Sequence, residues 1–254
     1  MILDKFKLNG KVAIVTGAGR GLGQGIAVGL AEAGADVALV VSASKADETA
    51  KQIQALGRRV CQIQANLLHK DSVAKIVDTT VKELGAVDIL VNNAGIIRRA
   101  PLLEFSEQDW DDVVQINQKS LFFLAQAAAK QMVKQGRGGK IINIASMLSF
   151  QGGIRVPSYT ASKSAVMGLT RIMANELAAH NINVNAIAPG YMETDNTAAL
   201  RADPKRNAEI LARIPSGRWG SPEDLKGAAV FLASAASDYL QGYTIAVDGG
   251  WLAR

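Results

Sequence analysis

The chain has 254 residues, of which 48% are hydrophobic and 20% are charged, a balance that fits one soluble globular domain. The net charge of +5 comes from scattered basic residues, so nucleic acid is not an expected partner. The start MILDKFKLNGK does not read as an export signal, and no run approaches the ~20 apolar residues of a membrane helix. A single cysteine, Cys61, excludes an internal disulfide and fits a reducing compartment. We therefore expect a cytoplasmic protein without membrane contacts.

Short apolar runs alternate with longer segments of helical spacing along most of the chain. Helices are predicted over about 22–33, 47–56, 71–84, 107–134 and 158–178. The predicted strands are KVAIVTG, DVALVV, RRVCQIQAN, VDILVNNAG, KIINIAS, INVNAIAPG and YTIAVDGG. Near-continuous apolar strands that alternate with helices indicate a parallel sheet covered on both faces. The predicted fold class is therefore α/β, a doubly wound, Rossmann-type parallel sheet of about seven strands in a single domain.

Unusual motifs stand where the predicted strands end. TGAGRG, NNAG, ASM and APG each follow a strand, and the carboxyl ends of parallel strands share one edge, where such folds bind ligands. The segment from about 190 to 222 interrupts the alternation and is much longer than ordinary connections of about 4–6 residues. We predict that it is a lid over this edge. The alternative is a helical insertion without a function.

The run TGAGRGLG, from Thr16 to Gly23, follows the first predicted strand and precedes a predicted helix. It departs from G-x-G-x-x-G because position 22 is leucine. Its glycines still permit a tight turn, and the N–H groups and dipole of the following helix suit a pyrophosphate. The run therefore predicts nucleotide binding, with a purely structural turn as the alternative.

Tyr159 and Lys163 are four residues apart and share one face of a predicted helix. A free phenol, with a pKa of about 10, is a poor acid–base group at neutral pH. A neighbouring ammonium favours the phenolate and lowers that pKa toward the operating pH. Ser146 ends the predicted strand KIINIAS and is placed at the same sheet edge. The three side chains together predict an acid–base site.

Other polar residues near this stretch are given structural roles. Ser158, behind Pro157, is expected to cap the helix, and Ser149 and Ser162 are placed at the periphery. Asn117 falls inside a predicted helix, where asparagine is a poor helix former. Its own pattern indicates a local kink with the amide bonded to backbone.

Taken together, these motifs resemble the short-chain dehydrogenase/reductase family over nearly the whole chain. The family's order is matched by the Gly-x3-Gly-x-Gly spacing, NNAG at 92–95, Asn117, Ser146, Tyr159-x3-Lys163, and Pro189-Gly190 with Thr194. The resemblance implies NAD(P)-dependent, reversible hydride transfer at CH–OH groups, with no metal. The implied catalytic set is Tyr159 as proton donor, Ser146 orienting the oxygen, Lys163 tuning Tyr159 and binding ribose, and Asn117 holding a relay water.

The resemblance also implies the residues that contact the cofactor, NAD(H) or NADP(H). The second strand ends ALVVSASK, without the acid near Val41 or Ser42 that usually binds the ribose of NAD. Arg20, Ser42, Ser44 and Lys45 suit a 2′-phosphate, whereas the resemblance favours NAD. In the third strand Asn66 stands where the family commonly has aspartate. The implied cofactor set is Gly17, Gly19, Arg20, Gly21, Leu22, Gly23, Ser42, Asn66, Leu67, Asn93, Ala94, Gly95, Tyr159, Lys163, Pro189, Gly190 and Thr194.

The substrate walls are expected in IIRRAPLLEF, MLSFQGGIRVP and YMETDNTAALRADPKRN, where Arg98, Arg99 and Arg155 suit a carboxylate. Solvated charge is the alternative reading of each arginine. The predicted substrate set is Arg99, Ser146, Arg155 and Tyr159. The run GGKIINIASMLSFQGGIRVPSYTASKS, with NAIAPGYM and IPSGRWG, is similar to family members that act on deoxy sugar acids, which implies a sugar-acid substrate and a homotetramer. The alternatives are a gluconate 5-dehydrogenase, a 3-oxoacyl-thioester reductase and, outside the enzyme class, a catalytically silent nucleotide sensor.

Overall fold

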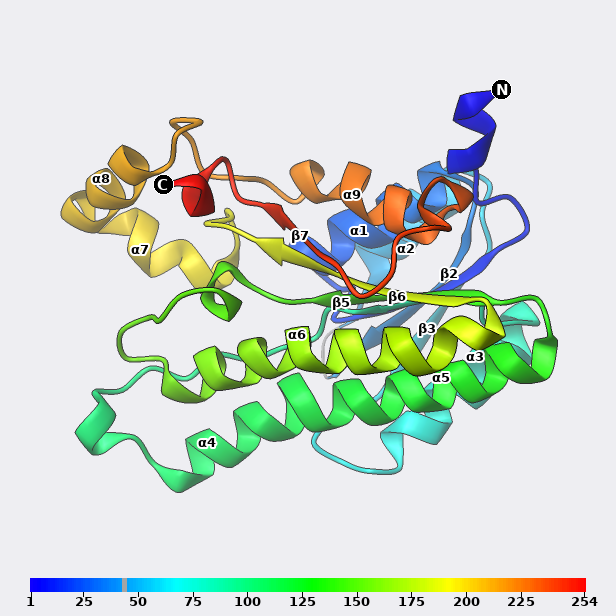
Figure 1. The fold of residues 1–254 in the computed structure, drawn as a ribbon, viewed down its shortest axis with the longest axis horizontal. Coiled ribbons are helices and arrows are strands. Elements are labelled where there is room, and N and C mark those ends of the chain that lie inside the picture. Colours follow the sequence, from blue (N-terminus) through cyan, green and yellow to red (C-terminus); the bar gives the residue numbers. More distant parts are fainter. Residues whose placement is uncertain (43–44) are drawn as a thin grey trace.

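A computed structural model describes residues 1–42 and 45–254 and places seven parallel strands of them in one sheet (Figure 1). From edge to edge these are β3 (Val60–Gln64), β2 (Asp36–Val41), β1 (Val12–Thr16), β4 (Ile89–Asn92), β5 (Gly139–Ile144), β6 (Ile182–Pro189) and β7 (Thr244–Val247). The strand order reverses direction between β1 and β4, which makes that point the ligand-binding crevice of the sheet. The predicted doubly wound sheet is confirmed.

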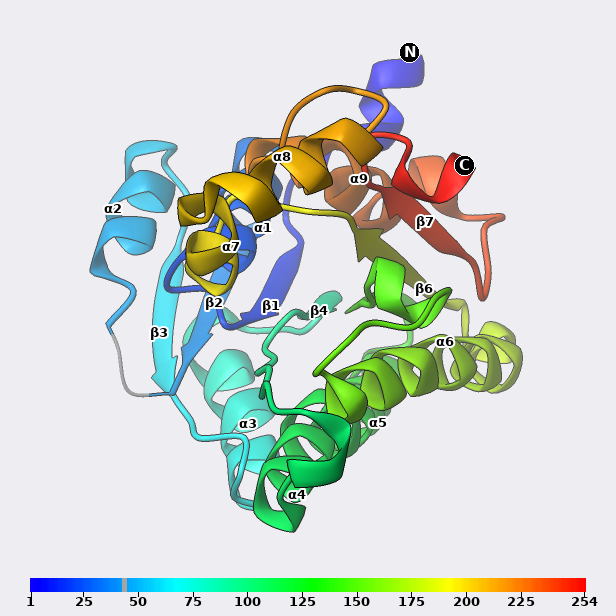
Figure 2. The ribbon, with the colours of Figure 1, turned by 90° about the vertical axis from the view of Figure 1, so that its left-hand side faces the viewer.

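Helices cover both faces of the sheet (Figures 1 and 2). One face carries α1 (Gly21–Glu32), α2 (Asp47–Ala55) and α9 (Glu223–Ala233), whose apolar side chains join one buried core. The other carries α3 (Ser72–Leu84), α5 (Leu121–Gln135) and α6 (Pro157–Leu177), which join a second core. Strands β1, β4 and β6 are buried along their whole length. This double burial explains why their sequences are almost continuously apolar.

The structure divides one predicted helix and corrects the predicted cap of another. The long helix predicted at about 107–134 is α4 (Glu107–Val114) and α5, joined by a π-helical turn at Gln115–Ser120. Helix α6 begins at Pro157, whose fixed φ suits a first helical position. The predicted cap by Ser158 is wrong: its side chain is fully buried one position inside the helix, and its hydroxyl has no partner among the described residues.

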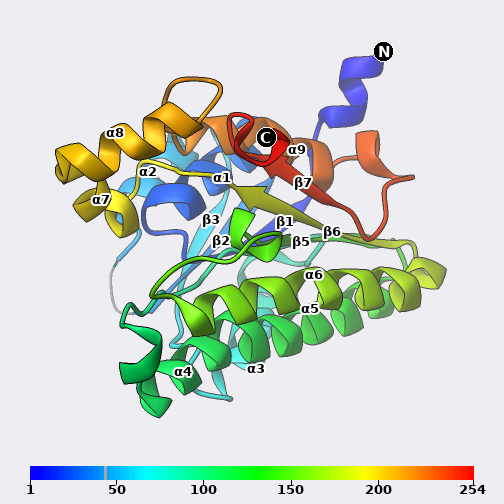
Figure 3. The same ribbon diagram turned by 60° about the vertical axis from the view of Figure 1, so that its left-hand side comes forward.

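The segment from about 190 to 222 projects beyond the carboxyl edge of the sheet (Figure 3). It contains a 3₁₀ turn at Asp195–Thr197, α7 (Ala198–Ala202) and α8 (Pro204–Arg213), and returns to the body through a bridge between Met192 and Gly220. The underside of α8 is anchored by a separate apolar cluster that includes Ile210, Trp219 and Trp251. The remaining 3₁₀ turns are Ile2–Phe6, Leu102–Glu104, Met147–Ser149, Ala178–His180, Ala235–Ser237 and Trp251–Ala253.

The helices lie within residues 1–42 and 45–254, the part of the chain that the structure describes. None of them combines the length and the apolar character needed to cross a bilayer.

Candidate active site

A pocket of about 970 Å³ opens at the carboxyl edge of the sheet, beneath the 190–222 segment. Its walls come from the ends of β1 to β6 and from the turn and helices of that segment. Every residue of the predicted cofactor and substrate sets lines this pocket. Of the predicted catalytic set, Ser146, Tyr159 and Lys163 line it, and Asn117 lies behind the wall. Residues 43 and 44 are outside the described residues, and so is the predicted phosphate contact of Ser44.

The loop after β1 is fastened to the segment after β4. Asn93 Nδ2 donates to the carbonyl oxygens of Thr16 (2.8 Å) and Gly17 (3.3 Å). Thr16 Oγ1 in turn accepts from the backbone N–H groups of Asn93 (3.0 Å) and Ala94 (2.9 Å). Gly17 has a φ of 66°, and a Cβ on Gly23 would collide with the Gly17 carbonyl, so both positions require glycine. This turn delivers the N-terminus of α1 to the pocket, where its free N–H groups suit an anion.

The ends of β2 and β3 shape the far side of the same groove. Ser42 and Lys45 are exposed beyond β2, within reach of solvent. Asn66 Oδ1 accepts from the backbone N–H of Leu68 (3.1 Å), so this amide stabilises its own turn. The Leu67 carbonyl accepts from the Ser120 hydroxyl (2.6 Å), which ties the turn to the start of α5.

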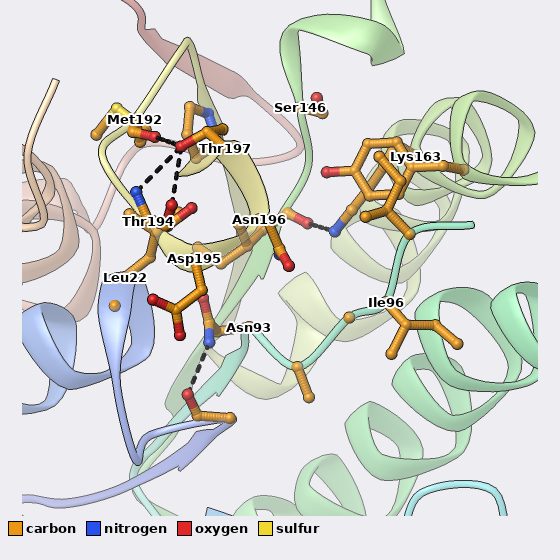
Figure 4. A pocket seen from close by; sticks show the side chains of 18 of the residues that line it. Leu22, Asn93, Ile96, Ser146, Lys163, Met192, Thr194, Asp195, Asn196 and Thr197 are labelled. Atoms are coloured by element: carbon orange, nitrogen blue, oxygen red, sulfur yellow. Dashed lines mark hydrogen bonds between the residues drawn. The ribbon is translucent and has the colours of Figure 1, made fainter. Parts of the chain in front are cut away.

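Lys163 is a buried ammonium beside the reactive tyrosine. Its side chain is 4% exposed, and Nζ donates to the Ile144 carbonyl (2.5 Å) at the end of β5. Nζ also lies 5.8 Å from the centre of the Tyr159 ring. Burial lowers the pKa of Lys163 to about 8, because the charged form is poorly solvated there. Figure 4 shows Lys163 among the side chains that line the pocket.

The pKa of the Tyr159 phenol is raised, whereas the sequence predicted that it would be lowered. Burial is the largest influence and raises the pKa of Tyr159, while the Ser146 hydroxyl and the charge of Arg99 act in the opposite direction. In the unliganded protein, desolvation therefore outweighs the favourable groups around the phenol. The protonated form, which donates a proton in the reducing direction, is the resting form at neutral pH.

Asn117 fixes the backbone of the pocket wall after β4 through hydrogen bonds to Ile96. Its Oδ1 accepts from the N–H of Ile96 and its Nδ2 donates to the Ile96 carbonyl, both at 2.9 Å. Nδ2 also donates to Ser162 Oγ (3.3 Å), which itself donates to the Tyr159 carbonyl (2.9 Å). The predicted amide-to-backbone bonding is confirmed, but the backbone belongs to the segment after β4. Gly95 permits this approach, because a Cβ there would lie 3.2 Å from Asn117 Oδ1.

Ser149 connects the two halves of the candidate catalytic set. Its hydroxyl accepts from the backbone N–H of Ser146 (3.2 Å) and donates to the carbonyl of Lys163 (2.6 Å). The loop that carries Ser146 is thereby fixed to the helix that carries Tyr159. The sequence identified Ser149 as structural but contained no signal for this link.

The structure separates the three predicted arginines. Arg98 turns toward α4, where its guanidinium pairs with Asp109 (3.1 Å) and Asp112 (3.9 Å). Arg99 turns the other way, and its Nη2 donates to the Asn196 carbonyl (3.1 Å) across the pocket. Arg155 is exposed on the wall, in a left-handed backbone conformation with a φ of 64°. Arg99 is therefore the best placed of the three for an anionic substrate.

Tyr191 and Arg206 are among the pocket residues that the predicted site sets did not include. The Tyr191 ring lies edge-on to Trp219 and Trp251, with centroids 5.3 and 4.7 Å apart. Burial raises the pKa of Tyr191, and the nearby charges of Arg206 and Arg213 lower it. Both residues lie in YMETDNTAALRADPKRN, the expected lid wall, but the position of Tyr191 depends on its contact with Trp251 in the C-terminal turn.

Comparisons with known proteins agree with this geometry. The family model described as short chain dehydrogenase matches residues 11–205. The chain is 66% identical, over the full length of both chains, to the 2-dehydro-3-deoxy-D-gluconate 5-dehydrogenase of Escherichia coli. A solved structure from Agrobacterium tumefaciens with bound NADP, proposed to be a 2-deoxy-D-gluconate 3-dehydrogenase, is 56% identical with a TM-score of 0.92, covering 99% of this chain and 100% of its own. A gluconate 5-dehydrogenase from Burkholderia cenocepacia, in complex with NADP and tartrate, is 40% identical with a TM-score of 0.94 over 100% of both chains.

The family match spans most of the chain, and the relatives match it from end to end. The motif order, the sheet and the pocket agree with that match. This protein is a member of the short-chain dehydrogenase family of oxidoreductases.

Proposed function

We propose that the protein moves a hydride reversibly between NAD(P) and a hydroxyl or carbonyl carbon of a sugar acid, with 2-dehydro-3-deoxy-D-gluconate oxidised at C5 as the substrate. The observation that carries the proposal is the convergence of Ser146, Tyr159 and Lys163 with the phosphate loop in one pocket. The substrate class is supported by the name of the Escherichia coli relative and by the guanidinium of Arg99 at the pocket wall.

The four catalytic candidates divide the acid–base work. A bound nicotinamide supplies or accepts the hydride. In the reducing direction, Tyr159 Oη gives its proton to the substrate oxygen while Ser146 Oγ orients that oxygen. The Lys163 ammonium, which already donates to the Ile144 carbonyl, stabilises the resulting phenolate and would bind the ribose hydroxyls of the cofactor. Asn117, in the π-helical turn, holds the water that returns a proton toward Lys163.

NADP is supported by the chemistry at the end of β2. Val41 and Ser42 offer no carboxylate to a ribose, and the Arg20 guanidinium stands at the same groove. Two of the solved neighbours reported above contain NADP, and neither supports the preference for NAD that the resemblance suggested. The protein therefore uses NADP at least as well as NAD.

Arg20→Ala is expected to weaken NADPH binding by about tenfold and NADH binding by less than about threefold, because a charge-assisted hydrogen bond to the 2′-phosphate is lost. Fluorescence titration of both reduced dinucleotides measures the two dissociation constants. Lys51→Ala, which removes an exposed charge from α2, is the matched control. Equal losses for NADPH and NADH would remove the 2′-phosphate role of Arg20.

Arg99 and Arg155 are proposed to contact the acid group of the substrate. Arg99→Ala is expected to raise the KM for sugar acids by about tenfold or more and to change the KM for a neutral ketone little, because only the acid loses an ionic partner. Arg98→Ala is the matched control, since its charge is paired with Asp109 outside the reacting centre. An equal effect of Arg99→Ala on acids and neutral ketones would contradict the assignment.

The alternatives make different predictions in one assay. Gluconate as the preferred substrate would favour the gluconate 5-dehydrogenase reading, for which the Burkholderia cenocepacia structure is the precedent. A 3-oxoacyl thioester would require an apolar wall, whereas Arg99, Arg155 and Arg206 line this pocket. A silent nucleotide sensor would bind dinucleotide without turnover, although the chain keeps the whole catalytic set. Steady-state assays that cross both cofactors with the three substrates are expected to rank the deoxy sugar acid first.

We also propose a cytoplasmic homotetramer. The outer faces of α5 and α6 expose large apolar side chains, among them Phe123, Val133 and Ile172. Closed symmetric assemblies commonly bury such faces. The number of four copies is the one that the family resemblance implies. Burial raises the pKa of the Cys61 thiol to about 11, which suits an unreactive packing group in a reducing compartment. Light scattering of the purified protein measures the mass of the assembly.

A further inference from the structure

The 3₁₀ turn at Asp195–Thr197 stands at the mouth of the pocket and is internally braced. Thr197 Oγ1 donates to the Met192 carbonyl (2.6 Å) and accepts from the Thr194 N–H (3.2 Å). Arg201 Nη2 donates to the Thr194 carbonyl (3.3 Å) from α7. Figure 4 draws the contacts of Thr197 with Met192 and Thr194 as dashed lines. These hydrogen bonds hold the turn together as one unit.

Two arginines from separate parts of the chain hold this turn. Arg20 Nη1, in the phosphate loop, pairs with Asp195 Oδ2 at 3.0 Å. Arg99 Nη2, in the segment after β4, donates to the carbonyl of the next residue, Asn196, at 3.1 Å. The turn is therefore connected to the cofactor side of the pocket through Asp195 and to the substrate side through Asn196.

Arg20 and Arg99 are also the groups expected to bind the anionic parts of the cofactor and the substrate. Arg20 and Asp195 are 81% and 72% exposed, so their ion pair is weak and easily exchanged. In Figure 4 the Asp195 side chain points toward the phosphate loop and Asn93, where a dinucleotide phosphate would approach. A phosphate would repel the Asp195 carboxylate and offer Arg20 a dianionic or bidentate partner. Binding of the 2′-phosphate of NADP to Arg20 thus competes with the Asp195 carboxylate.

We propose that Asp195 is a positioning residue that acts through Arg20. Its carboxylate occupies the Arg20 guanidinium when the 2′-phosphate of the cofactor is absent. With the cofactor site empty, Asp195 draws the turn over the pocket. NADP then binds Arg20 through its 2′-phosphate and releases the turn, and the acid group of the substrate afterwards displaces the Asn196 carbonyl from Arg99. This exchange favours binding of dinucleotide before substrate, and recapture of Arg20 by Asp195 speeds release of the spent dinucleotide. The inference rests on the proposed function.

Asp195→Asn is expected to tighten NADPH binding by about threefold to tenfold and to slow its dissociation, because the competing carboxylate is gone. The KM for the sugar acid should change by less than about twofold, whereas kcat should fall where release of dinucleotide limits turnover. Glu193→Gln, an exposed carboxylate in the same segment, is the matched control and should leave both constants unchanged. Stopped-flow displacement of NADPH gives the dissociation rate.

A double-mutant cycle tests whether Asp195 acts through Arg20. In an Arg20→Ala background, Asp195→Asn is expected to change NADPH affinity by less than about twofold. An equal tightening in both backgrounds, or none in either, would overturn the inference. If neither NADPH nor NADH bound the wild-type protein, the proposed function itself would fail; wild-type binding with Asp195→Asn indistinguishable from Glu193→Gln would refute only the role of Asp195.

Discussion

Replacement of Tyr159 by phenylalanine is expected to lower turnover by about 10²–10⁴-fold, the usual contribution of a positioned general acid. The substitution removes only the hydroxyl, so the ring keeps its packing beside Lys163 and the fold is preserved. Dinucleotide affinity should change by less than about threefold, because the phosphate loop and Lys163 are untouched. Steady-state rates and NADPH titration of the same preparation separate these two effects.

Tyr243→Phe is the control for this variant. Its side chain is 60% exposed beside β7, away from the pocket, and its loss should leave turnover unchanged. A Tyr159→Phe enzyme with near-wild-type turnover would contradict the role of the phenol as proton donor.

Lys163→Met is expected to abolish turnover and yet to make the unliganded protein more stable at neutral pH. Burial lowers the pKa of this lysine from 10.5 to about 8. One pKa unit corresponds to about 1.4 kcal/mol, so the charged side chain costs the folded state about 3 kcal/mol. The lost hydrogen bond to the Ile144 carbonyl offsets about 1 kcal/mol of this, which leaves a gain of about 2 kcal/mol in the free energy of unfolding.

The pH dependence gives the sign of the effect. Below pH about 8 the lysine is protonated in both the folded and the unfolded chain, so the folded state carries the full cost. Between pH about 8 and 10.5 the lysine is neutral in the folded protein but still protonated in the unfolded chain. The free-energy cost to the folded state falls steadily over this range and is gone once the unfolded chain has also lost its proton. Denaturant unfolding should therefore show the stability gap between Lys163→Met and wild type closing over this range. A variant less stable than wild type at neutral pH would contradict the account, and Lys51→Met is the exposed control.

The sequence predicted the sheet and the main motifs because both depend on local patterns. The strands are almost continuously apolar since helices cover them on both faces, and Tyr159 and Lys163 share a helix face at a fixed spacing. The Gly-rich turn was recognisable because Gly17 has a positive φ and Gly23 has no room for a Cβ, so both positions require glycine. Local patterns of this kind can be recognised in the amino-acid sequence alone.

The errors concern features that tertiary contacts decide. Ser158 looked like a helix cap, but Pro157 already occupies the first helical position and leaves that hydroxyl inside. Arg98 and Arg99 are neighbours of the same type, and only the position of α4 reveals that one is paired and the other faces the pocket. The raised pKa of Tyr159 reflects burial, which no spacing rule reports. The contact of Arg20 with Asp195 joins distant segments and was equally invisible.

The central claim is that this pocket transfers hydride between NADP and a deoxy sugar acid. The most direct measurement is the change in reduced-nicotinamide absorbance when the purified wild-type protein meets 2-dehydro-3-deoxy-D-gluconate and either NADP or NAD, with Tyr159→Phe as the blank. The account predicts substrate-dependent formation of reduced cofactor, with NADP at least as effective as NAD, and about 10²–10⁴-fold less in the blank. No turnover of the sugar acid with either cofactor by a protein that binds both would contradict it.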